Sequence, residues 1–117
     1  VNLGVLLKNE EALYSINKAI EINSLSGKYF SLKGTILAST GRLEEAQTYI
    51  DRSLQLDSTN VQGWLSKSAM MLTLKNKKEA IKAYNKAIEL KPELKKRKEM
   101  FINAKGMKSY FESYFKN

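Results

Sequence analysis

The sequence predicts an all-α protein built from stacked pairs of antiparallel helices, and three observations support this prediction. The 117 residues include no Cys, no His, one Pro and six Gly, which leaves few turn residues for a many-stranded β fold. Matching residues recur every 34 positions along the chain. Within each copy, apolar residues recur at three and four residues, which is the spacing of one helix face. The length fits one small domain.

The period of 34 residues is most evident in the second half of each copy. A shift of 34 residues aligns Ala46 with Ala80, and a shift in the other direction aligns Ala46 with Ala12. The same register aligns further apolar, small or turn-forming residues: Phe30 with Trp64, Leu37 with Met71, Ile16 and Ile50 with Tyr84, Ala19 and Ser53 with Ala87, Leu56 with Leu90, and Ser58 with Pro92. Three copies of one register indicate a repeat architecture, whose units stack because one unit cannot bury its apolar face alone.

Each full copy is predicted to contain two helices. The first helices are expected at about residues 27–39 and 61–74, with Ser26 and Asn60 as N-caps. Gly41 supplies the positive φ that ends the earlier one, and Asn76 can cap the helix that follows the later one. The small residues aligned with Ala46 are expected where two helices cross closely, because a large side chain would keep the backbones apart.

The earliest copy is expected to be incomplete. Its second helix is complete, and residues 1–7 are interpreted as the remainder of its first helix. The pairs Glu10–Glu11 and Glu44–Glu45 are then expected in the first turn of their helices, where negative charge is stabilising. The chain begins with Val1, and we expect it to be part of a longer chain.

The 34-residue unit resembles the tetratricopeptide repeat, whose signature runs Trp, Leu-Gly, Tyr, Ala, Phe, Ala and Pro. The later copy departs from it at Lys67 and Ser68, and the earlier copy departs at Lys33, Ser53 and Ser58. The residues that carry the resemblance are Trp64, Ala80, Tyr84, Ala87 and Pro92 in the later copy, and Phe30, Gly34, Ala46 and Ile50 in the earlier one. The resemblance implies an α-α superhelix over residues 1–92, with a partial repeat at 1–24 and full repeats at 27–58 and 61–92.

In tetratricopeptide proteins the first helix of each pair lines a concave groove that takes an extended or helical peptide. Family members that bind chaperone tails hold the terminal carboxylate with Lys, Arg and Asn, whereas Leu65 and Ala69 occupy that region here. An apolar partner segment therefore fits better. The resemblance implies that the partner-binding groove is lined by Lys28, Ser31, Thr35, Ala38, Gln62, Leu65, Ala69 and Leu72.

Residues 93–117 lie outside the repeats and are expected to form a C-terminal capping helix and an aromatic tail helix. Pro92 and Glu93 suit a helix start, and Leu94, Phe101, Ile102 and Ala104 give the cap an apolar side. After Gly106, the aromatic residues Tyr110, Phe111, Tyr114 and Phe115 fall on one side of a helix. This tail either folds back on the repeats or serves as a docking face for a partner or a second copy of the chain. A short membrane-surface helix is a third alternative.

The net charge of +8 is concentrated in the second half of the chain. Residues 1–58 hold six Lys or Arg against seven Asp or Glu, and residues 59–117 hold fourteen against five. The candidate basic face consists of Lys78, Lys82, Lys86, Lys95, Lys96, Arg97 and Lys98. Such a face can attract nucleic acid or an anionic surface, although a Lys row on an outer helix is usually a solvated surface.

The residue inventory argues against catalysis, because His and Cys are absent and no phosphate-binding loop or metal cluster is present. We expect no enzyme activity, no cofactor and no metal. The predicted function is an adaptor or scaffold that binds a protein or peptide partner in the groove. The alternative is a basic accessory domain that binds nucleic acid or an anionic surface through its C-terminal half.

Nucleic acid and membrane are not the expected partners, and the expected compartment is the cytoplasm. The N-terminal edge and the aromatic tail are further candidates for self-association.

Overall fold

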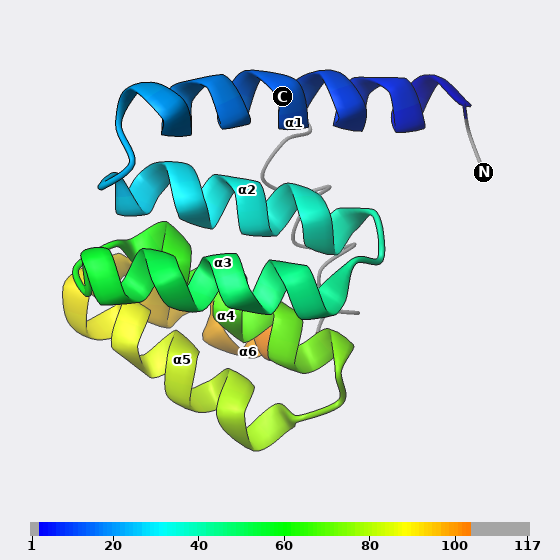
Figure 1. Ribbon diagram of the computed structural model, residues 1–117. Helices are drawn as coiled ribbons and strands as arrows, with labels where there is room; N and C mark the ends of the chain where they lie inside the picture. The colour runs from blue at the N-terminus through cyan, green and yellow to red at the C-terminus, as the bar shows by residue number, and fades with distance from the viewer. Residues whose placement is uncertain (1–2, 104–117) are drawn as a thin grey trace.

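The computed structural model describes residues 3–103, with side chains from residue 8 onward. Within this range the chain is helical and has no strand (Figure 1). The elements are α1 (Leu3–Ile22), α2 (Gly27–Ser39), α3 (Leu43–Leu56), α4 (Val61–Thr73), α5 (Lys77–Leu90), the 3₁₀ helix η1 (Pro92–Arg97) and α6 (Lys98–Ile102). The predicted all-α class is confirmed.

Two helix pairs form the body of the fold. Helix α2 packs against α3, and α4 packs against α5. The pairs stack because α4 contacts both α2 and α3, while α1 packs on α2 at one end (Figure 1). At the other end, α6 contacts α4 and α5, and η1 contacts α5. The result is the helical repeat stack that the 34-residue period predicts.

The three predicted N-caps are confirmed. The side chains of Ser26, Asn60 and Asn76 each accept a hydrogen bond, at 3.3 Å, from the backbone N–H three residues further along. Each bond satisfies a donor that would otherwise lack a partner in the first turn of a helix. The beginnings of α2, α4 and α5 are therefore determined by local sequence.

The predicted turn at Gly41 is also confirmed, since this residue has φ +87°. The residue aligned with it in the next copy is Lys75, which has φ 60° without being glycine. In the first copy the aligned residue is Leu7. A γ-branched residue such as leucine disfavours the left-handed region, so nothing in this first copy favours a turn there.

The absence of a turn at Leu7 explains one wrong prediction. Residues 3–7 do not belong to a separate helix, because a single helix runs from Leu3 to Ile22. Glu10 and Glu11 therefore lie well inside α1 rather than in its first turn, and the helix-start explanation fails for this pair. It holds for Glu44 and Glu45, which lie in the first turn of α3.

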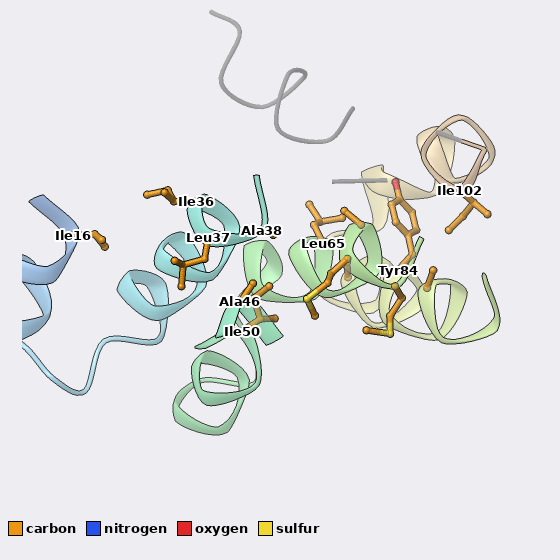
Figure 2. Packing of buried hydrophobic residues seen from close by; sticks show 14 of the residues in the cluster. Ile16, Ile36, Leu37, Ala38, Ala46, Ile50, Leu65, Tyr84 and Ile102 are labelled. Carbon is orange, nitrogen blue, oxygen red and sulfur yellow. The ribbon is translucent and has the colours of Figure 1, made fainter. Parts of the chain in front are cut away.

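The core runs as a continuous row from α1 to α6. Figure 2 shows it beginning at Ile16, passing through Leu37 and Ile50, and ending at Tyr84 and Ile102. The aligned small residues Ala46 and Ala80 have no exposed surface, as a close helix crossing requires. The repeat register thus places equivalent residues at equivalent crossings.

One departure from the family signature has a clear structural explanation. A Cβ on Gly34 would lie 2.5 Å from Cγ1 of Ile50 and 3.0 Å from the carbonyl oxygen of Ala46. In the next copy the aligned residue is Ser68, and its hydroxyl donates a hydrogen bond of 2.7 Å to the carbonyl oxygen of Ala80. The serine thus bonds to the carbonyl that the glycine approaches, and this contact accommodates it in a buried crossing.

The expected single capping helix is divided into two elements. Pro92–Arg97 is a 3₁₀ helix and Lys98–Ile102 is a short α-helix. Leu94, Phe101 and Ile102 do form its apolar side, since all three are at least half-buried against the core. Ala104 and the predicted aromatic tail lie outside the described residues.

Candidate functional site

The first helices of the two full copies, α2 and α4, lie in contact with each other and carry the predicted groove residues. The accessible members are Lys28, which is exposed, and Gln62 and Leu72, which are half-buried. The other five are buried, namely Ser31, Thr35, Ala38, Leu65 and Ala69. The predicted set therefore divides into three residues that solvent can reach and five that it cannot.

Hydrogen bonds between α2 and α4 explain why the polar members are buried. The hydroxyls of Thr35 and Ser66 lie 2.6 Å apart, in a contact that joins the two helices. The amide of Asn60, the cap of α4, donates to the hydroxyl of Ser31 at 3.2 Å. Paired in this way, Ser31 and Thr35 hold the two first helices side by side.

The apolar members are buried for a different reason. Ala38, Leu65 and Ala69 belong to the core cluster, and α4 is in contact with α2, α3, α5 and α6. An outward-facing role for Leu65, which we expected from the sequence, does not agree with its 8% exposure. Leu72, near the end of α4, keeps part of its surface accessible.

Leu32 is an accessible residue of α2 that the sequence interpretation missed. It is half-buried, whereas Ser66, the residue aligned with it in the next copy, is buried. Ser66 lies on α4 and is covered by α2, to which its hydroxyl is bonded through Thr35. Leu32 lies on α2, whose neighbour on the side away from α4 is mainly α1. Comparing aligned positions between the two full copies is the signal that could have found it.

The predicted basic face lies on three elements. On α5, Lys78, Lys82 and Lys86 are exposed, and the last two form ion pairs with Glu79 (3.5 Å) and Glu89 (3.6 Å). On η1 and α6, the basic residues are Lys95, Lys96 and Arg97, which are exposed, and Lys98, which is half-buried. No ion pair joins any of these four to another residue in the range 8–103.

Comparison with known families decides how these helices are to be interpreted. A model of the tetratricopeptide repeat matches residues 27–60 and 62–94. Together the two matches cover more than half of the chain and contain α2–α5 except for Val61, the first residue of α4. This chain belongs to the tetratricopeptide repeat family.

Two curated relatives contain a similar stretch of sequence. They are the human and the mouse DnaJ homolog subfamily C member 7, each 28% identical to this chain over 100 residues. The similarity covers 86% of this chain and 20% of each relative. The chain therefore spans about a fifth of the length of the curated relatives it matches.

Membership of the tetratricopeptide repeat family gives the class of function. Tetratricopeptide repeats are protein–protein interaction modules and are generally non-enzymatic. The two matched repeats contribute α2 and α4 as their first helices, the elements on which Lys28, Gln62 and Leu72 are accessible. Of the groove residues expected from the sequence, only these three are accessible.

Two polar side chains at the ends of α3 have structural partners that shift a pKa, whereas the buried hydroxyl of Ser53 on α3 has no hydrogen-bond partner within the described residues. Arg42 forms two hydrogen bonds with Glu45, at 3.2 and 2.8 Å, and this contact raises the pKa of the guanidinium. Hydrogen bonds from Thr59 lower the pKa of the Asp57 carboxyl at the end of α3. The described part of the chain has no acidic cluster suited to a metal ion. It also has no helix with the length and hydrophobicity needed to cross a membrane.

Proposed function

We propose that this protein is a non-catalytic adaptor that binds a segment of a partner protein across its first helices, α2 and α4. Direct contact between these two helices supports the proposal, because it lets one partner segment reach both. Lys28 on α2 and Leu72 on α4 are the residues we assign to the contact. They combine an exposed cation with a partly exposed apolar side chain.

The buried members of the predicted groove contribute indirectly in this proposal. The Thr35–Ser66 contact and the Asn60–Ser31 hydrogen bond fix the spacing of α2 and α4. A preorganised surface loses less conformational entropy on binding than a flexible one. A partner would then meet a face whose geometry is already set.

Affinity capture with a charge-matched pair of variants tests this proposal. The face variant is Lys28→Glu with Leu72→Glu. The control is Lys18→Glu with Gln47→Glu, which makes the same change in charge at exposed positions of α1 and α3. Circular dichroism first establishes that both variants keep the helicity of the wild type. Tagged protein is then used to capture partners from a lysate of the source cells.

The expected result is a captured protein that the wild type and the control retain and the face variant loses. Recovery of the same proteins by both variants would contradict the assignment to α2 and α4. Treating the lysate with nuclease tests the alternative of a nucleic-acid-binding domain. A partner that disappears with nuclease and is unaffected by the face variant would favour that alternative.

A further inference from the structure

We infer that the C-terminal cap, formed by η1 and α6, is a second binding surface, which takes an acidic peptide segment with apolar side chains. The surface consists of five basic residues, here called the cap cluster, together with Met100: Lys91, which directly precedes η1, Lys95, Lys96, Arg97 and Lys98. It goes beyond the proposed function because none of these residues lies on α2 or α4.

The charge of the cap cluster is available to a partner. Four of its five residues are exposed, and none forms an ion pair with another residue in the range 8–103. The carboxylates within the same stretch are Glu93 and Glu99, so basic groups outnumber acidic ones five to two. On α5, Lys82 and Lys86 are paired with Glu79 and Glu89, whereas Lys77 and Lys78 form no ion pair within the range 8–103. Unpaired, accessible cations favour an anionic partner and accelerate its association.

The cap cluster is held in a defined position by the core. The hydroxyl of Tyr84 on α5 donates a hydrogen bond of 2.8 Å to the carbonyl oxygen of Leu94, in the middle of η1. The ring of Tyr84 also packs against that of Phe101, with 4.8 Å between centroids. Ile102 completes the attachment as part of the core (Figure 2). Anchored in this way, the basic side chains start from fixed backbone positions.

Met100 indicates that the partner also carries apolar side chains. It lies on α6, immediately after the basic stretch, and is 78% exposed. A flexible thioether side chain adapts to varied apolar groups and is common at protein-binding surfaces. A peptide that combines carboxylates with apolar side chains matches both the cap cluster and Met100.

The described part of the cap suits nucleic acid less well. Single strands are usually held by stacking bases on accessible aromatic rings, and the rings here, Tyr84 and Phe101, are packed against each other. Three of the four exposed cations lie on a 3₁₀ helix of six residues and the fourth, Lys91, directly precedes it, and such an element is short for reading a groove of double-stranded DNA. The combination of charge and an exposed methionine therefore favours a peptide.

Fluorescence anisotropy with defined probes tests the inference. The first probe is a labelled peptide in which Glu alternates with Leu, and the second replaces every Glu with Gln. A labelled single-stranded RNA is the third. The cap variant is Lys95→Glu, Lys96→Glu and Arg97→Glu. Its control is Lys78→Glu, Lys82→Glu and Lys86→Glu, which makes the same change in charge on α5.

The acidic peptide is expected to bind the wild type, and its affinity for the cap variant should be lower by about tenfold or more. The affinity of the α5 control for the peptide is expected to fall by about threefold or less, since these substitutions change only the long-range electrostatic field at the cap. Met100→Ser should weaken the binding of the Glu–Leu peptide without changing the salt dependence of that binding. The Gln peptide should bind weakly to every form.

Equal loss in the cap variant and the α5 control would overturn the inference, because it would indicate a diffuse field rather than a site. Tighter binding of the RNA than of the peptide would also overturn it. The proposed function is tested separately: the face variant, Lys28→Glu with Leu72→Glu, leaves the cap cluster intact. Failure at either surface is thus distinguishable from failure at the other.

Discussion

At the scale of single residues, the fold depends on small side chains at the helix crossings. Ala80 has no exposed surface, and its carbonyl oxygen accepts the hydrogen bond from the buried hydroxyl of Ser68. A larger side chain at this position must displace either α4 or α5. Ala80→Leu is therefore expected to lower the free energy of unfolding by about 1–3 kcal/mol, measured by urea denaturation.

The aligned position in the first copy provides a matched control. Ala12 occupies the same register on α1 but is only half-buried. Ala12 packs against the edge of the core, where a larger side chain can extend toward solvent, so Ala12→Leu should change the free energy of unfolding by about 0.5 kcal/mol or less. Equal costs at the two positions would contradict the claim that Ala80 lies at the tighter crossing.

Some residue roles could be predicted from the sequence and others could not. The caps Ser26 and Asn60, and the turn at Gly41, depend on local chemistry and were predicted correctly. The burial of Thr35 and Leu65 depends on which helices lie beside them, so their position on a helix face did not reveal it. Their assignment to a partner contact followed from family resemblance alone.

At the scale of elements, the C-terminal cap is attached to α5 through the hydroxyl and ring of Tyr84. Tyr84→Phe removes the hydrogen bond to Leu94 and should cost about 0.5–1.5 kcal/mol in the free energy of unfolding. The aromatic contact with Phe101 is retained in this variant. Urea denaturation measures the cost. Tyr14→Phe is the control, because Tyr14 is exposed and should give no comparable loss.

The same tyrosine predicts a dependence of stability on pH. Burial raises the pKa of the Tyr84 hydroxyl, so the folded protein holds this proton more tightly than the unfolded chain does. Its contribution to stability is complete below about pH 10, the ordinary pKa of tyrosine, and is lost as the pH rises through the folded value. Above about pH 10, the free energy of unfolding should fall more steeply in the wild type than in Tyr84→Phe.

The prediction concerns the difference between the two slopes, since lysines and other tyrosines also lose protons in this range. Tyr14→Phe should follow the wild-type slope. Identical slopes for the wild type and both variants would contradict the assigned role of Tyr84.

The sequence predicted the elements inside the repeats more accurately than those at the ends. The two copies that form α2–α5 have a side-chain N-cap on the first helix, a positive φ in the turn and a buried alanine at aligned positions, so each copy supports the interpretation of the other. The continuous α1 and the division of the cap into η1 and α6 have no second copy for comparison. The missing turn at Leu7 was visible only after its aligned residues, Gly41 and Lys75, were known to have positive φ.

At the scale of the whole molecule, stability should vary along the stack. Helix α1 packs mainly on α2, whereas α4 is in contact with four other helices. Amide hydrogens in α1 should therefore exchange faster than those in α2–α5, because opening α1 disrupts fewer contacts. Hydrogen exchange followed by mass spectrometry checks this prediction. Protection of α1 equal to that of α4 would contradict it.

The distribution of accessible residues supports one functional account of the whole molecule. Buried hydrogen bonds and small side chains hold α2 and α4 together, and Lys28 and Leu72 remain accessible on them. The central claim is that a partner protein contacts these two helices. It is most directly tested by a photo-activated cross-linking residue, introduced separately at Lys28 and Leu72, and at Gln47 on α3 as a control.

The account predicts that, on illumination in a lysate, the residue at Lys28 or Leu72 cross-links to the same partner protein, and that the residue at Gln47 does not. Cross-linking from Gln47 alone, or equally from all three positions, would contradict the claim that α2 and α4 carry the binding face.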